Sequence, residues 1–123
     1  MIKETKKIFH DEKIKVAATT VRVPVFRAHS ESITLELAEK PDLARIRKIL
    51  EKAPGVKVVD DRGNNYFPMP LEASGKDDVL VGRIRKDLSS DKGLCLFVSG
   101  DQLRKGAALN AIQIAEILCG ISS

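Results

Sequence analysis

The stretch VLVGRIRKDLSSDKGLCLFVS, residues 79–99, decides the fold. Its two ends, residues 79–85 and 94–99, are rich in apolar and β-branched residues, and each predicts a strand. The turn that separates them, at residues 89–93, contains serine, aspartate and glycine. Because such a connection is too short for a crossover, it favours an antiparallel pair.

Further strands and helices flank this pair. Residues 33–37 alternate apolar with polar side chains and predict a strand, as do the β-branched residues of 14–25 and of 56–59. An amphipathic helix is predicted at residues 2–10, and a final helix with a broad apolar surface at residues 103–119. A further helix follows Pro41 and Asp42, ends at Pro54 and Gly55, and carries the apolar stripe Leu43, Ile46, Ile49 and Leu50.

This mixture predicts an α+β domain with a mixed, largely antiparallel sheet and helices packed on one face. The other face of such a sheet needs cover. A second copy of the chain could supply it, so dimerisation through the sheet follows as a structural hypothesis.

Composition narrows the class of protein. With 123 residues, 43% hydrophobic and 31% charged, the chain matches one globular domain. A net charge of +4 with 4% aromatic residues does not predict a nucleic-acid platform, and no apolar run is long enough for a bilayer. Cys95 and Cys119 do not form a metal-ligand pattern, and we expect both thiols to be reduced and buried. We expect the protein to be cytoplasmic.

Candidate chemistry gathers in residues 22–31. His29 can exchange a proton near neutral pH, and Arg22 offers a planar fork to a carboxylate. On spacing alone, the favoured interpretation is an ordinary surface or capped histidine and an ordinary ion pair. Neither a GxSxG nucleophile elbow nor a GxGxxG dinucleotide fingerprint occurs in the sequence, so a hydrolase is disfavoured and the usual dinucleotide site is missing.

Five strings resemble one enzyme family in order and cover nearly the whole chain. They are VRVPVFRAHSE (21–31), APGVKVVDD (53–61), YFPMP (66–70), VGRIRK (81–86) and DQLRKGAALNA (101–111). Together they resemble the carboxy-terminal part of the aspartate-semialdehyde dehydrogenases.

The resemblance implies NADPH-dependent reduction of L-aspartyl 4-phosphate to L-aspartate 4-semialdehyde through a cysteine thioester, in lysine, threonine and methionine biosynthesis. It implies that His29 is the general acid/base, that Arg22 holds the substrate carboxylate, and that Gln102 approaches the nicotinamide. A cytoplasmic homodimer is expected, with no nucleic-acid or membrane partner. Residues 1–99 then belong to the catalytic and dimerisation domain, and residues 100–123 form the closing helix that packs on the NADP-binding domain.

The sequence also departs from the family pattern, since neither Cys95 nor Cys119 matches the nucleophilic cysteine. We therefore expect a fragment of a longer enzyme that is inactive alone. Two alternatives stay open: a non-catalytic dimerisation or scaffold module derived from the family, and an enzyme like N-acetyl-glutamyl-phosphate reductase.

Overall fold

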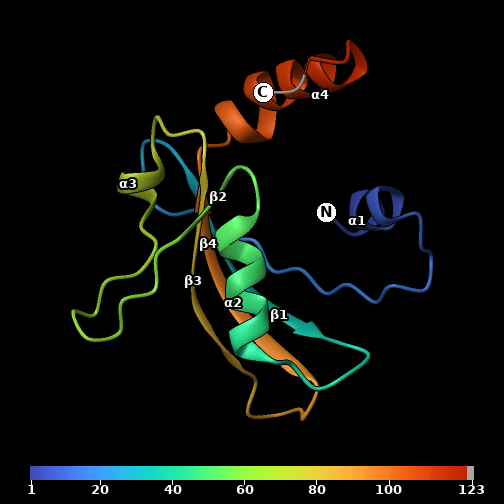
Figure 1. Ribbon diagram of the computed structural model, residues 1–123, viewed down its shortest axis with the longest axis vertical. Coiled ribbons are helices and arrows are strands. Elements are labelled where there is room, and N and C mark those ends of the chain that lie inside the picture. The colour runs from blue at the N-terminus through green and yellow to red at the C-terminus, as the bar shows by residue number, and fades with distance from the viewer. Residues whose placement is uncertain (122–123) are drawn as a thin grey trace.

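A computed structural model describes residues 1–121 (Figure 1). The chain folds into a four-stranded sheet with helices around it. The elements in chain order are α1 (Ile2–Phe9), β1 (His29–Glu36), α2 (Leu43–Lys52), β2 (Val56–Val58), α3 (Pro70–Ala73), β3 (Val79–Lys86), β4 (Gly93–Gly100), the π-helix η1 (Arg104–Ala108) and α4 (Leu109–Leu118).

The sheet has the strand order β1-β4-β3-β2. β4 lies antiparallel to both β1 and β3, whereas β2 pairs with β3 in parallel. The tight connection between β3 and β4 forms the predicted antiparallel pair, and the sheet is mixed and largely antiparallel, as expected. The α+β fold is therefore confirmed.

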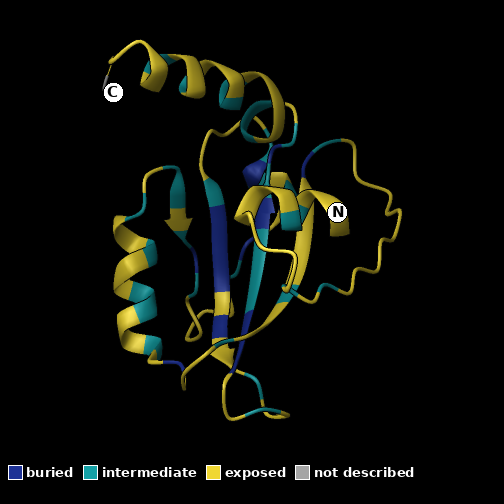
Figure 2. Cartoon of the chain, turned by 90° about the vertical axis from the view of Figure 1, so that its right-hand side faces the viewer, coloured by how far each residue is buried: buried dark blue, intermediate teal, exposed yellow. Residues whose placement is uncertain are grey.

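The helix α2 covers one face of the sheet (Figure 2). It begins at Asp42, whose carboxylate accepts hydrogen bonds from the amides of Ala44 and Arg45 at 3.0 and 3.1 Å. Its apolar side packs against a core centred on Val81, Ile84 and Leu94. The helix side chains in this contact are Leu43, Ile46 and Leu50, whereas Ile49, which the pattern assigns to the same stripe, is exposed.

At one end of the opposite face, Ala28, Val59, Ala73 and Leu80 form a second apolar cluster. In β1 and β4, Leu94 and Leu96 point toward α2, and so do their partners Leu35 and Ile33. Because side chains alternate along a strand, the residues between them point to the opposite face. The intervening side chains of β1 and β4 form what we call the open face: Ser32, Thr34, Cys95 and Phe97.

A β-bulge interrupts β3 where its pairing with β4 shifts between Gly82 and Arg85. Gly82 lies against the chain that follows β2, since a Cβ there would be 2.0 Å from the carbonyl oxygen of Val59. Arg83, inside the bulge, has a φ of 50°, and its guanidinium lies 4.6 Å from the centroid of the Phe67 ring.

The strand predicted at residues 14–25 is wrong, because residues 14–25 contain neither helix nor strand in the structure. Val21, Val23 and Val25 are exposed, and the Val25 amide bonds to the carbonyl of Val23 instead of a neighbouring strand. β-branched residues favour a strand only where they meet a partner edge and a covered face. This segment meets neither.

The last predicted helix is present, although it opens with a π-helical turn, η1, before α4. The pair extends away from the end of the sheet (Figure 1), and no residue of either helix is buried. Cys119, at the end of α4, is exposed, so the expectation that both cysteines are buried holds for Cys95 alone.

Candidate functional site

His29 and Gln102 lie at the same end of the sheet. His29 is the first residue of β1 and pairs with Gly100, the last residue of β4. Because Gln102 follows Gly100 closely in the chain, the antiparallel register places both predicted site residues at this end of the sheet. His29 is exposed and Gln102 is half-buried, so both border solvent at this end.

The amide oxygen of Gln102 is buried and has no hydrogen-bond partner among the described residues. Buried polar atoms are almost always paired, and leaving one unpaired costs free energy. An acceptor of this kind, at the same end of the sheet as an exposed imidazole, is available to accept a hydrogen bond from a bound molecule.

Arg22 lies in the irregular segment before β1 and is exposed. Within residues 1–121 its guanidinium makes no hydrogen bond or ion pair. The structure does not bring Arg22 into contact with His29 or Gln102, and it leaves the guanidinium accessible to an anion from solvent.

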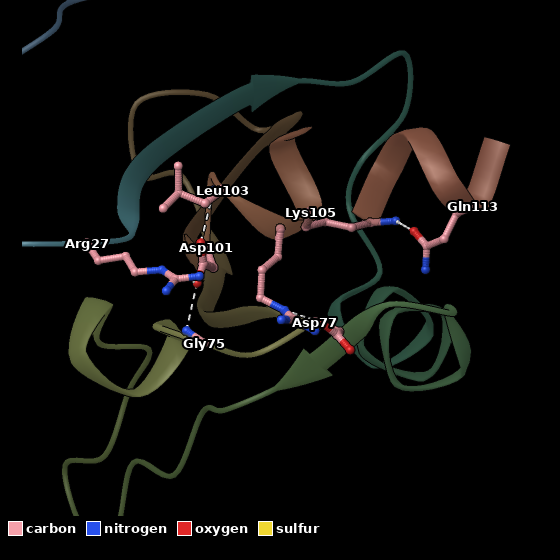
Figure 3. Close-up of polar contacts among 8 residues, drawn as sticks. Arg27, Gly75, Asp77, Asp101, Leu103, Lys105 and Gln113 are labelled. Carbon is pink, nitrogen blue, oxygen red and sulfur yellow. Dashed lines mark hydrogen bonds and ion pairs between the residues drawn. The ribbon is translucent and has the colours of Figure 1, made fainter. Parts of the chain in front are cut away.

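Asp101, which sequence reasoning missed, is the buried acid beneath this end of the sheet (Figure 3). One carboxylate oxygen accepts from the Gly75 amide at 2.7 Å and forms an ion pair with Arg27, whose Nε lies at 2.7 Å outside hydrogen-bond geometry. The other oxygen accepts from the Leu103 amide at 2.9 Å. One carboxylate thus joins the entrance to β1, the loop before β3 and the start of η1.

The environment of Asp101 favours its charged form. Desolvation by burial acts to raise the pKa of the carboxyl, but the amide hydrogen bonds from Gly75 and Leu103 and the contact with Arg27 outweigh it. The pKa of Asp101 is therefore held below its usual range.

Ala28 joins Arg27 to His29 in a strained backbone conformation. Its φ is 76°, in the left-handed region that non-glycine residues rarely adopt, and only 2% of its surface is exposed. Nothing in the local sequence signals this conformation, because the position is not a glycine. The packing of Ala28 against Leu80 and Ala73 maintains it.

Two further polar contacts position η1 (Figure 3). Arg104 forms an ion pair with Asp77 in the loop before β3, and this partner lowers the pKa of Asp77. Within the helical pair, Nζ of Lys105 donates to the Gln113 amide oxygen at 2.6 Å. The turn that follows Gln102 is thereby fixed to the loop before β3 on one side and to α4 on the other.

Neither thiol among the described residues lies near His29. Cys95 is in the middle of β4, opposite Thr34, and is separated from Gly100 by about 17 Å at roughly 3.4 Å per residue. Its Sγ lies 3.8 Å from Oγ1 of Thr34. Cys119 is at the far end of α4.

Residues 1–121 contain no group of three or more side chains placed to ligate a metal ion. None of their helices combines the length and apolarity needed to cross a membrane.

A family profile described as "Semialdehyde dehydrogenase, dimerisation domain" matches residues 1–105. Among curated proteins, the chain is 58% identical over 118 residues to an aspartate-semialdehyde dehydrogenase of Synechocystis, covering 96% of this chain and 35% of that protein. It is 50% identical over 119 residues to the Bacillus subtilis protein of the same name, covering 96% and 34%. The chain thus spans about a third of the length of these relatives.

Solved structures give the same result. The fold is similar to that of aspartate semialdehyde dehydrogenase II from Vibrio cholerae complexed with ASA, with a TM-score of 0.89 and 44% identity over 97% of this chain and 35% of that one. It is also similar to the Francisella tularensis aspartate semialdehyde dehydrogenase, with a TM-score of 0.82 and 33% identity over 94% and 33%.

Proposed function

This chain belongs to the semialdehyde dehydrogenase dimerisation-domain family, and on that premise we propose that it is the substrate-side, dimer-forming part of an aspartate-semialdehyde dehydrogenase. The observation that carries the proposal is the pairing of His29 with Gly100 at one end of the sheet, two residues before Gln102. The reaction proposed is the NADPH-dependent reduction of L-aspartyl 4-phosphate to L-aspartate 4-semialdehyde, in the cytoplasm, for lysine, threonine and methionine biosynthesis.

His29 is the general acid/base in this proposal. Its imidazole is exposed at the start of β1, so a substrate can approach it, and imidazole exchanges protons near neutral pH. It would take the proton of the attacking thiol and return a proton to the oxygen of the tetrahedral intermediate. The backbone of His29 follows the strained residue Ala28, and the buried carboxylate of Asp101 lies beneath the same end of the sheet.

Arg22 binds the substrate carboxylate in this proposal. A guanidinium can make two parallel hydrogen bonds to a carboxylate, which orients the substrate as well as holding it. The exposed position of Arg22 leaves its donors available. Since Arg22 lies in an irregular segment, we expect bound substrate to fix its side chain.

Gln102 is suited to the nicotinamide end of NADP. Its buried, unpartnered amide oxygen can accept a hydrogen bond from a carboxamide N–H, so the residue fits the group. A bound NADPH would supply the hydride that reduces the thioester to the aldehyde. The rest of the cofactor site is proposed to lie outside this chain, against α4, whose apolar side chains are exposed.

The nucleophilic thiolate is proposed to come from another part of the protein. Cys95 is buried in β4 away from His29, and Cys119 lies at the end of α4. A reacting thiol must lie within hydrogen-bond reach of its base, and neither cysteine does. We therefore expect no turnover from residues 1–121 alone.

The proposal is tested by combining this chain with the remaining two thirds of a close relative and measuring NADPH oxidation with L-aspartyl 4-phosphate. We expect activity to appear only in the mixture, and we expect His29→Asn to lower it by about 10²- to 10⁴-fold. Activity with N-acetyl-glutamyl phosphate and none with L-aspartyl 4-phosphate would show that the proposed substrate is wrong. Full activity of the His29→Asn variant would reject the proposed role of His29.

A further inference from the structure

We propose that Asp101 and Arg27 are positioning residues that hold His29 and Gln102 in register at the end of the sheet. The inference rests on the proposed function, because it takes His29 and Gln102 as the groups that meet substrate and cofactor. Neither Asp101 nor Arg27 needs to touch the reacting atoms for this role.

The carboxylate of Asp101 is suited to this role because both of its oxygens are paired with groups of the protein itself. Its side chain is 0% exposed, and both oxygens are used within the protein. The amides of Gly75 and Leu103 donate to it at 2.7 and 2.9 Å, and Nε of Arg27 lies at 2.7 Å. A buried carboxylate with charged and backbone partners has one low-energy position, so the segments that bind it are fixed relative to each other.

The contact of Arg27 with Asp101 restrains the backbone of His29, because Ala28 connects the two residues. Only Ala28 separates the two residues, and it is buried and held at a φ of 76°. The strained conformation persists only while its surroundings enforce it. Loss of the Arg27 contact would therefore let residues 27–29 relax and move the imidazole relative to the end of β4.

On the other side, Asp101 fixes the turn that contains Gln102. Its side chain accepts from the Leu103 amide, which closes an Asx-turn around Gln102. Its backbone carbonyl also accepts from the amides of Arg104 and Lys105 at 3.1 and 3.0 Å, which begins η1. A single residue thus orients both proposed site groups.

The chain offers a matched control in the ion pair of Arg47 with Asp60. This aspartate side chain is also 0% exposed and also accepts a backbone amide, that of Arg83, at 2.7 Å. The two arginines are comparably exposed, 38% for Arg27 and 34% for Arg47. The control pair joins α2 to the β3 bulge, so its loss should perturb folding in a similar way without reaching His29.

The test compares Arg27→Gln, Arg27→Lys and Arg47→Gln in the full-length protein that carries this chain, with kcat, KM and the urea unfolding midpoint measured for each. We expect Arg27→Gln to lower kcat by roughly 10- to 100-fold with KM within about twofold, the scale of a misplaced catalytic group. Arg27→Lys should recover part of kcat. Arg47→Gln should keep kcat within about twofold, whatever its unfolding midpoint.

Equal kcat values for Arg27→Gln and Arg47→Gln, or an effect of Arg27→Gln on the unfolding midpoint alone, would overturn the positioning role. Asp101→Asn is a second variant, and it should match Arg27→Gln in kcat if it folds; if it does not fold, Arg27→Gln decides. His29→Asn separates the two hypotheses. If it abolishes turnover and Arg27→Gln does not lower kcat, only the positioning role fails, whereas if it leaves turnover intact, the proposed function fails as well.

Discussion

Ile84 is the largest apolar side chain that the described core buries completely, with 1% of its surface exposed. It lies within the bulge of β3, between Gly82 and Arg85, and packs beneath α2. Replacing it with alanine removes buried methyl groups and leaves a cavity that a packed core fills only in part. We expect Ile84→Ala to lower the free energy of unfolding by about 2–5 kcal/mol in urea titrations.

Ile49→Ala is the matched control for that experiment. Ile49 belongs to α2 but is 57% exposed, so its truncation should change the free energy of unfolding by no more than about 0.5 kcal/mol. Similar losses from both variants would contradict the assignment of Ile84 to the core.

Asp101 makes stability depend on acid pH. Its pKa is lower in the folded state than in the unfolded chain, so its contribution is present above the unfolded value, near the ordinary 3.8, and is lost as pH falls through the folded value. We expect the urea midpoint to fall below about pH 4. Asp101→Asn should flatten that decline, and Asp91→Asn, in an exposed loop, should not.

The sequence predicted His29 and Arg22 from their chemistry, and Gln102 from the family strings, but it did not predict a role for Asp101. An aspartate directly after a strand is most often an ordinary turn residue. Its burial depends on Arg27 and Gly75, which come from distant parts of the chain and meet only after the sheet forms. The unpaired oxygen of Gln102 is likewise a property of tertiary structure.

At the scale of elements, the β3 bulge depends on Gly82. A Cβ at this position would lie 2.0 Å from the Val59 carbonyl oxygen and 2.6 Å from Cδ of Pro68, so backbone must move. We expect Gly82→Ala to lower the free energy of unfolding by about 1–3 kcal/mol, measured in urea. Gly75→Ala would be a poor control because its φ is 75°, whereas Gly106→Ala meets only the Cβ of Gln102 at 3.7 Å and should be tolerated.

Elements with strong local sequence patterns were predicted well, whereas the segment 14–25, which has no neighbouring strand to pair with, was not. β3, β4 and α2 appear where alternation, turn residues and an aspartate cap place them. Residues 14–25 have the composition of a strand, but strand formation also requires an edge to pair with. Such an edge is a property of the assembled sheet, so composition alone could not decide this segment.

At the scale of the whole molecule, the open face is the surface available for dimerisation. It combines small polar residues of β1 with Phe97 of β4 and lies opposite the face that α2 covers. The family is named for dimerisation, and an isologous sheet contact would cover this face. We expect a dimer in light scattering across a concentration series.

Two neighbouring residues of β1 test which face is used. Ser32→Lys places a charge on the open face and should raise the dimer dissociation constant by at least about tenfold, because a desolvated charge opposes association. Glu31→Lys places its charge on the face toward α2 and should leave the dimer dissociation constant nearly unchanged. A persistent monomer in the unmodified chain would count against dimerisation through the sheet.

The separation of the two cysteines has a practical consequence. Cys95 is buried within β4, whereas Cys119 is exposed at the end of α4. A maleimide dye or nitroxide label should therefore attach at the tip of this helix without mutagenesis. Fluorescence energy transfer or electron spin resonance from that label would test whether this helix docks against another part of the full-length protein.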